Sequence, residues 1–162
     1  MKNERFHETM KKFMLVGAVS AGKTSLMQAI YGQDLSYQKT QAIDFKDNII
    51  DTPGEYLEQR FRYRSLGITA ADTDLIVLVQ SCTDLRCVFA PGLSSMFAKP
   101  MVGVVTKIDL AKSPTDIARA KKNLQLAGCK TIFTISSKDK TGIPAFQSFI
   151  GMEPNLQSPQ NE

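Results

Sequence analysis

The residues with the clearest chemical potential lie near the N-terminus, where two glycines bracket a short loop. Gly17 and Gly22 are separated by four residues, and Lys23 and Thr24 follow, which fits Gly-x-x-x-x-Gly-Lys-Thr. A short apolar run precedes the loop and a helical pattern follows it. Backbone N–H groups of such a loop and the positive end of the next helix can surround a phosphate chain. We therefore predict a phosphate-binding loop, or P-loop, over residues 17–24.

The side chains of this loop suggest separate roles in phosphate chemistry. Glycine permits backbone angles and close approaches that a Cβ would obstruct. Lys23 would neutralise the outer phosphates and the Thr24 hydroxyl would ligate Mg²⁺, so these two are the candidate catalytic residues. The alternative is a chance glycine-rich turn with an ordinary surface lysine. The predicted phosphate-contacting residues are Gly17, Ser20, Ala21, Gly22, Lys23, Thr24 and Ser25.

A second polar group follows an expected strand further along the chain. Asp51 precedes Thr-Pro-Gly, and its carboxylate would hold Mg²⁺ opposite the P-loop. The N–H of Gly54 would contact the last phosphate, and loss of that phosphate would release the segment behind it. Thr40 would supply a second hydroxyl, which makes Thr24, Thr40 and Asp51 the predicted metal ligands. A turn aspartate and an exposed loop threonine are the alternatives at positions 51 and 40.

A third group has the chemistry to recognise a base. Asp109 ends Thr-Lys-Ile-Asp, and its carboxylate can accept hydrogen bonds from N1–H and the exocyclic amine of guanine. Adenine presents the opposite pattern and is rejected. Lys107 can lay its aliphatic stem across the base. Backbone N–H groups of the Ser-Ser-Lys loop at 136–138 would donate to guanine O6, although such a loop is also an ordinary β-to-α turn. The predicted base-contacting residues are Thr106, Lys107, Asp109, Ser136, Ser137 and Lys138.

Alternating strands and helices must position these residues. Strands are predicted over 13–17, 42–45, 48–51, 74–81, 101–106 and 131–136, and helices over 23–31, 56–71, 93–98, 114–127 and 144–150. Continuous apolar runs in the fourth and fifth strands suit parallel strands that are covered on both faces. The pattern predicts a three-layer α/β fold with about six mostly parallel strands, one antiparallel edge strand and helices on both faces. Because all the motif loops follow strands, we expect them on one rim.

Length and composition limit the remaining possibilities. The chain has 162 residues, which favours one domain, and we divide it into an N-terminal extension over 1–12, a domain over 13–150 and a disordered tail over 151–162. No apolar run approaches the ~20 residues of a membrane-spanning helix, and no signal peptide is evident. The net charge of +4 is too small to require a nucleic-acid partner.

Histidine and cysteine usage excludes several enzyme classes. The only histidine is His7, which argues against a Ser-His-Asp hydrolase, a Cys-His protease and a histidine-rich metal site. The three cysteines form no C-x-x-C pair, so a reducing cytoplasm is expected.

The motifs, in this order, resemble those of translation-factor and Ras-like GTPases over about residues 10–150. A closer resemblance is to the EutP/PduV family, the small P-loop proteins of bacterial ethanolamine and propanediol utilisation, and slightly more to its propanediol member. The segments that carry it are Tyr-Gln-Lys-Thr-Gln-Ala-Ile at 37–43, Ile-Asp-Thr-Pro-Gly-Glu-Tyr-Leu-Glu at 50–58, Pro-Gly-Leu at 91–93 and Val-Thr-Lys-Ile-Asp-Leu at 105–110. The resemblance implies a cytoplasmic protein associated with a bacterial microcompartment, with a shell or pathway protein as partner.

Two positions depart from the GTPase pattern. Thr106 stands where the guanine motif usually has asparagine, and a hydroxyl can make fewer tethering bonds than a carboxamide. Glu55 stands where Ras-like enzymes carry a water-orienting glutamine, and we do not assign it as a base. Slow hydrolysis is therefore expected. The arginines at 60, 62 and 64 could include an arginine finger, but a solvated basic helix face is the preferred reading.

Three functions are compatible with these observations. The leading one is a switch or accessory factor that binds GTP or GDP with Mg²⁺ and hydrolyses GTP slowly in ethanolamine or propanediol utilisation. The second is a P-loop phosphotransferase that resembles an ATP-dependent acetate kinase and uses the same Lys23, Thr24 and Asp51. The third is a non-catalytic interaction module that residues 1–12 target to a microcompartment and that bound nucleotide stabilises.

Overall fold

The computed structural model describes residues 10–32, 44–46, 49–52, 54 and 63–152, and all structural statements concern these residues. In chain order the elements are β1 (Phe13–Val16), α2 (Lys23–Ile30), β2 (Asp44–Lys46), β3 (Ile49–Asp51), α4 (Tyr63–Ala71), β4 (Leu75–Ser81), η2 (Leu93–Met96), β5 (Met101–Thr106), η3 (Ile108–Leu110), α5 (Pro114–Ala127), β6 (Ile132–Thr134) and α6 (Ile143–Phe149).

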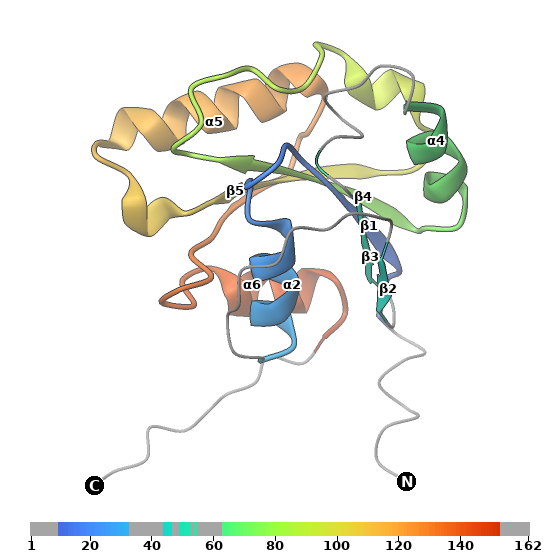
Figure 1. The fold of residues 1–162 in the computed structure, drawn as a ribbon, viewed down its shortest axis with the longest axis horizontal. Helices are drawn as coiled ribbons and strands as arrows, with labels where there is room; N and C mark the ends of the chain where they lie inside the picture. Colours follow the sequence, from blue (N-terminus) through green and yellow to red (C-terminus); the bar gives the residue numbers. More distant parts are fainter. Residues whose placement is uncertain (1–9, 33–43, 47–48, 53, 55–62, 153–162) are drawn as a thin grey trace, which may run out of the picture.

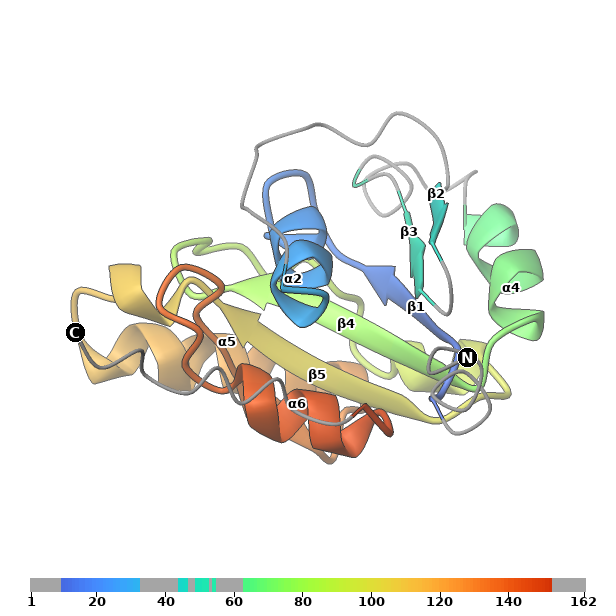
Figure 2. The same ribbon diagram turned by 90° about the horizontal axis from the view of Figure 1, so that it is seen from below.

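The described strands form one six-stranded sheet with the order β2-β3-β1-β4-β5-β6. All neighbouring strands pair in parallel except β2, which lies at the edge and runs antiparallel to β3. Helices α4 and α5 cover one face of the sheet, and α2 and α6 cover the other (Figures 1 and 2). The predicted three-layer α/β fold, with its antiparallel edge strand, is confirmed.

The two faces of the sheet bury separate apolar clusters because successive residues of a strand point to opposite sides. In β4, Val77 and Val79 pack with Leu26 of α2 and Phe146 of α6. The alternating residues of β4 pack on the other face with α4 and α5. A strand that is covered on both faces must be apolar throughout, which explains the continuous run that predicted β4.

Helix α5 begins and ends as its sequence predicts. Ser113 and Asp116 form a capping box, and Pro114 occupies the first helical position. Backbone hydrogen bonds, above all from the Lys112 N–H, lower the pKa of the Asp116 carboxyl. Gly128 ends the helix with φ 113°, a left-handed conformation that favours glycine.

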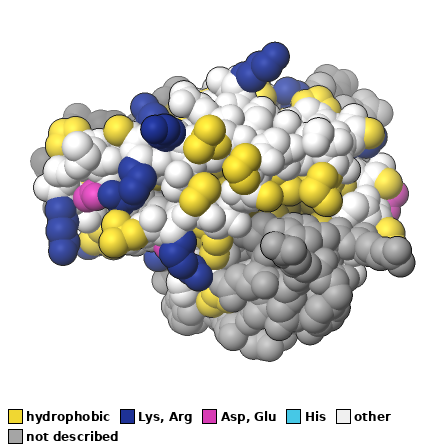
Figure 3. Space-filling model, turned by 90° about the horizontal axis from the view of Figure 1, so that it is seen from above, with side chains coloured by type: hydrophobic (Ala, Val, Ile, Leu, Met, Phe, Trp, Pro, Cys, Tyr) yellow, Lys and Arg dark blue, Asp and Glu magenta, His cyan; other side chains and the backbone are white. Residues whose placement is uncertain are grey.

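The face formed by α4, η2 and α5 carries scattered hydrophobic and basic side chains (Figure 3). Ile68 of α4, Met96 of η2 and Leu126 of α5 are exposed. White polar and backbone atoms lie among the hydrophobic side chains in this view, and single exposed apolar residues are normal on protein surfaces.

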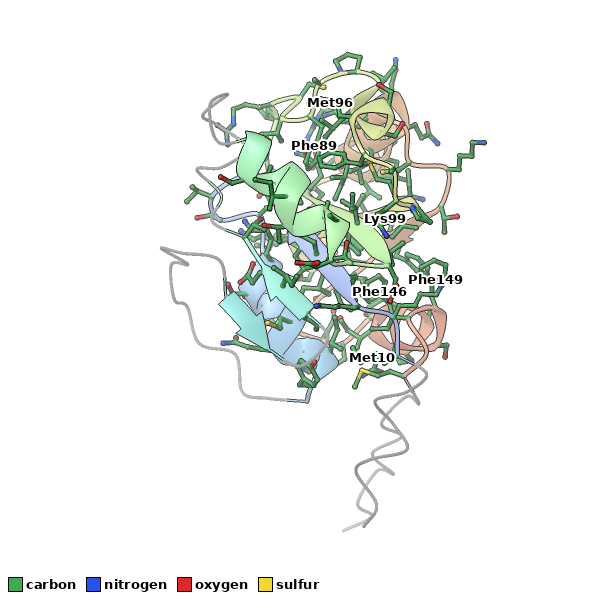
Figure 4. The ribbon with its side chains drawn as sticks, turned by 90° about the vertical axis from the view of Figure 1, so that its right-hand side faces the viewer. Met10, Phe89, Met96, Lys99, Phe146 and Phe149 are labelled. Atoms are coloured by element: carbon green, nitrogen blue, oxygen red, sulfur yellow. The ribbon has the colours of Figure 1, made fainter. Side chains whose placement is uncertain are left out.

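Residues that flank the predicted 13–150 domain pack against it. Met10 is buried and belongs to the apolar cluster that contains Phe146 of α6 (Figure 4). The N–H of Lys11 donates to Ile150 O at 2.8 Å, and the Lys11 ammonium lies 4.3 Å from the ring centre of Phe149. The N–H of Met152 donates to Gln147 O at 2.8 Å. Met10 and Met152 therefore both contact the packed part of the chain.

Met10→Ala is expected to lower the free energy of unfolding by about 2 kcal/mol, because it leaves a void beside α6. Urea denaturation measures the change. Met96→Ala is the matched control, since Met96 is 62% exposed and its truncation should cost less than about 0.5 kcal/mol. Equal effects of the two substitutions would contradict the core position of Met10.

Candidate nucleotide-binding site

The predicted motif loops follow β1, β3, β5 and β6, and contacts between them bring them together. Because these four strands run parallel, their carboxyl ends lie at the same edge of the sheet. The first loop, over 17–22, contacts both the segment after β3 and the end of β5. The expected single rim is therefore present for the described residues.

The P-loop wraps around the side chain of its own lysine. Lys23 opens α2 and is buried, and its Nζ donates to Gly17 O at 2.9 Å and to Ala18 O at 3.0 Å. Ser20 and Gly22 have φ angles of 63° and 96°, so two residues of the loop are left-handed. This curvature, followed by the start of α2, is typical of loops whose N–H groups bind anions.

Two glycines allow the loop to lie close to its neighbours. A Cβ on Gly17 would stand 2.5 Å from Val79 O of β4. A Cβ on Gly54 would collide with the backbone of Ala18 and Val19. Gly54, the residue predicted to contact the last phosphate, thus packs directly on the P-loop.

Gly54→Ala is expected to displace the P-loop, because the added methyl group meets backbone atoms that cannot rotate away. We expect nucleotide affinity to fall about tenfold or more and stability to fall by about 1–3 kcal/mol. Titration calorimetry and urea denaturation measure the two effects. Gly67→Ala is the control, since a Cβ there meets nothing within 4 Å. Unchanged affinity in Gly54→Ala would contradict the tight packing.

Thr24 and Asp51 meet behind the P-loop. The Thr24 Oγ1 donates to Asp51 Oδ2 at 2.7 Å, and Asp51 is buried at the end of β3. Thr52 holds this strand end in place, because its hydroxyl donates to Leu15 O of β1 at 2.6 Å. A hydroxyl and a carboxylate are hard oxygen ligands, which suit Mg²⁺ when phosphate oxygens and water complete the shell. The residues present therefore fit the predicted metal, and Thr40 lies outside the described residues.

Thr106 and Lys107 fasten the base-motif loop to the P-loop. The Thr106 Oγ1 donates to Ala21 O at 2.5 Å, and the Lys107 Nζ donates to Ser20 O at 2.6 Å. Lys107 has φ 59°, and its carbonyl accepts from the Cys82 Sγ at 3.1 Å. Burial raises the pKa of the Cys82 thiol, which keeps the donated proton in place. The P-loop and the β5 loop therefore form one hydrogen-bonded unit.

Asp109 lies beside the loop that follows β6. Ser136, which is fully buried, donates its hydroxyl to Asp109 Oδ1 at 2.8 Å. The N–H of Asp139 donates to the same hydroxyl at 3.3 Å. Hydrogen bonds from Thr141 lower the pKa of the Asp139 carboxyl.

A cavity of about 280 Å³ lies between the P-loop, the β5 loop and the β6 loop. Its lining joins predicted base-contacting residues with two predicted phosphate-contacting residues, Gly22 and Ser25, and with Leu110, for which no role was predicted. The lining residues are Gly22, Ser25, Thr106, Lys107, Asp109, Leu110, Ser137 and Lys138.

A larger cavity of about 540 Å³ lies at the other end of the sheet, where the parallel strands begin. Its lining includes three lysines and no residue of the predicted motifs. These lysines are Lys11, Lys99 and Lys130, and Lys99 and Phe149 are labelled on this side of the molecule in Figure 4. The predicted motif residues therefore line the smaller of these two cavities, and cavity volume alone would not have identified their site.

Some candidates fall outside what the structure describes, and some contacts carry no sequence signal. Glu55 and the arginines at 60 and 62 lie outside the described residues, as does the side chain of Arg64. Cys82 and Leu110 were not predicted as site residues, although Leu110 ends the Val-Thr-Lys-Ile-Asp-Leu segment. Their places in the site depend on strand pairing and loop packing. In the described ranges, no three His, Cys, Asp or Glu side chains form a ready metal site.

The model of the family described as "Ethanolamine utilisation - propanediol utilisation", PduV-EutP, matches residues 10–152. The chain belongs to the PduV-EutP family. Within it, the "Propanediol utilization protein PduV" of Citrobacter freundii is 42% identical over 141 residues, which cover 87% of this chain and 93% of the relative. The "Probable acetate kinase EutP" of Escherichia coli K12 is 32% identical over 144 residues, 87% and 89% of the two chains. The family and the predicted slight preference for its propanediol member are confirmed.

Solved structures place the fold of this family member among G-domains. The FeoB G-domain from Methanococcus jannaschii superposes with a TM-score of 0.60 at 22% identity, and the match covers 86% of this chain and 94% of that one. At this identity the likeness concerns the fold alone. None of the described helices has the length and apolar character needed to cross a bilayer.

Proposed function

We propose that this chain binds GTP or GDP with Mg²⁺ and hydrolyses GTP slowly, as a switch or accessory factor in ethanolamine or propanediol utilisation. The observation that best supports this proposal is that hydrogen bonds connect the P-loop to the cavity that contains Asp109. Thr106 and Lys107, which line this cavity, donate these bonds to carbonyl oxygens of the P-loop. A phosphate site and a guanine-compatible carboxylate thereby belong to one rigid unit. Membership of the PduV-EutP family supports the pathway.

The phosphate half would work by neutralising charge. Lys23 is held at the loop carbonyls of Gly17 and Ala18, within the curve where the phosphate chain would lie. Thr24 and Asp51 would hold Mg²⁺, which neutralises charge on the outer phosphates when bound. Thr40 remains a proposed third ligand.

The base half would work by matching hydrogen-bond donors and acceptors. Asp109 would accept from N1–H and the amine of guanine, and Ser136 orients its carboxylate by donating to Oδ1. Residues of the 136–138 loop would donate backbone N–H groups to O6. Lys107, which spans from the cavity to the P-loop, would cover the base with its aliphatic stem.

We expect slow hydrolysis because of the residue at position 55, where Ras-like enzymes carry a water-orienting glutamine. Glu55 has only acceptor oxygens when ionised, and a γ-phosphate would repel it. Positioning and charge neutralisation would still accelerate the reaction, but the sequence has Glu55 where a water-orienting glutamine would stand. A protein partner in the cytoplasm, such as a microcompartment shell or pathway protein, would supply that group or read the nucleotide state.

The direct test is to measure affinities of the full chain for GTP, GDP and ATP with Mg²⁺ and to follow phosphate release over hours. We expect GTP and GDP to bind at least about 100-fold more tightly than ATP. Adenine would place an unprotonated N1 and a C–H group against Asp109, and its 6-amine against the N–H donors of the 136–138 loop. Slow release of phosphate from GTP is the second expected result. Equal binding of GTP and ATP would overturn the proposal.

A second function is favoured by the name of the Escherichia coli relative, "Probable acetate kinase EutP". Lys23, Thr24 and Asp51 would serve phosphoryl transfer from ATP to acetate as well as hydrolysis. Incubation with ATP, acetate and hydroxylamine would trap acetyl phosphate as the hydroxamate. Formation of hydroxamate by the wild-type protein, but not by Lys23→Ala, would favour this function over the GTPase.

A further inference from the structure

Thr106 stands at the junction of the phosphate and base halves of the site. It is the last residue of β5, is 2% exposed and lines the 280 Å³ cavity. Its Oγ1 donates to Ala21 O at 2.5 Å. An ideal Cβ on Gly22 would lie 3.4 Å from this Oγ1, so the side chain also packs against the turn that starts α2. Thr106 is therefore a clamp on the P-loop.

A hydroxyl has one hydrogen to donate, whereas a carboxamide has two. The single hydrogen of Thr106 is committed to Ala21 O, so none remains for a ligand in the cavity. The Lys107 ammonium, another donor in the cavity lining, is bound to Ser20 O on the P-loop. The cavity wall at Thr106 thus presents lone pairs and a methyl group.

Guanine carries acceptors at N7 and O6 and donors at N1 and the exocyclic amine. Asp109 would take the donors and the 136–138 loop would take O6, which leaves N7 in need of a donor from another part of the wall. Thr106 cannot be that donor, because its hydrogen already serves the P-loop.

We propose that Thr106 commits its hydrogen bond to the P-loop and that, among the residues the structure describes, N7 of the bound purine is left without a side-chain donor. The inference rests on the proposed guanine-nucleotide function and deepens it. Recognition then depends on the Asp109 edge of the base. Because guanine and adenine share N7, the loss lowers affinity for both purines and leaves the choice between them to Asp109.

The test compares GTP with 7-deaza-GTP, in which a C–H group replaces N7. We measure the dissociation constants of both nucleotides by competition against a fluorescent GDP, for the wild-type chain, Thr106→Asn, Thr106→Ser and Thr106→Val. The readout is the ratio of the two constants, which is independent of the fraction of folded protein and of any general weakening of the site.

The wild type and Thr106→Ser are expected to bind GTP and 7-deaza-GTP within about twofold of each other. Thr106→Asn adds an amide hydrogen and is expected to prefer GTP by about three- to tenfold, the value of one net hydrogen bond. Thr106→Val removes the clamp and is expected to weaken both nucleotides equally.

The outcomes separate this inference from the proposed function. A wild type that binds GTP but discriminates tenfold against 7-deaza-GTP has a donor at N7, and the inference fails while the function stands. A Thr106→Asn ratio that stays near one would show that position 106 does not face N7, which also overturns it. If the wild type binds neither GTP nor GDP, the proposed function itself fails.

Discussion

Lys23→Ala is expected to weaken GTP binding by about 100-fold and to abolish measurable turnover. Lys23 would lose its charge-assisted hydrogen bonds to the outer phosphates, and each such bond contributes about 1.5–3 kcal/mol. Lys107 also binds the P-loop, but at Ser20 O and not at the Gly17 and Ala18 carbonyls that hold Lys23, so we do not expect it to replace the lost charge. Fluorescent-nucleotide competition gives the affinity, and a phosphate-release assay gives the turnover.

The control for Lys23→Ala must remove a lysine that lies away from the motif loops. Lys121 lies on the exposed side of α5, and Lys121→Ala should leave affinity and turnover unchanged. Lys23 is buried and donates to two carbonyls, so Lys23→Ala is also expected to lower stability. Urea denaturation of the variant shows whether it is folded under the conditions of the binding assay. If folded Lys23→Ala binds GTP with wild-type affinity, the proposed role of the P-loop in GTP binding is wrong.

Asp109→Asn is expected to exchange guanine for xanthine specificity. The amide would face the N1–H and amine of guanine with a donor of its own, and GTP affinity should fall by at least about 100-fold. Xanthine has a carbonyl in place of the amine, so XTP pairs with the new amide and should become the preferred nucleotide. Competition with GTP, XTP and ATP measures the exchange, since a merely unfolded variant would bind none of them.

Asp72→Asn is the matched control, because Asp72 is an exposed carboxylate beyond α4 and remote from the cavity. Its nucleotide preference should equal that of the wild type. An Asp109→Asn variant that retains GTP affinity and gains none for XTP would show that Asp109 does not read the base.

Much of this protein could be predicted from short-range patterns. The spacing of Gly17, Gly22, Lys23 and Thr24, between an apolar run and a helical pattern, predicts the loop and the elements around it. Buried parallel strands such as β4 are apolar at every position, so they and the three-layer fold are visible in sequence. The cap residues of α5 act within one turn of chain, and its bounds were predicted for the same reason.

The boundaries of the domain depend on contacts between distant segments. Met10 follows charged and polar residues, and nothing local indicates that it packs in the cluster containing Phe146. The Lys11 N–H reaches Ile150 O across nearly the whole chain. Such contacts exist only once α6 has been placed against β1, so residue patterns could not reveal them.

Thr106 shows, within the candidate site, which properties could be predicted from sequence and which depend on the tertiary structure. Sequence determined that a hydroxyl stands where a carboxamide is usual, and that Asp109 follows at the spacing of a guanine motif. Only the tertiary structure decided where the hydroxyl hydrogen goes, because Ala21 is 85 residues away in the chain and meets Thr106 through the pairing of β1, β4 and β5. Residue types set the number of hydrogen bonds that a group can make, and the fold chooses the partners.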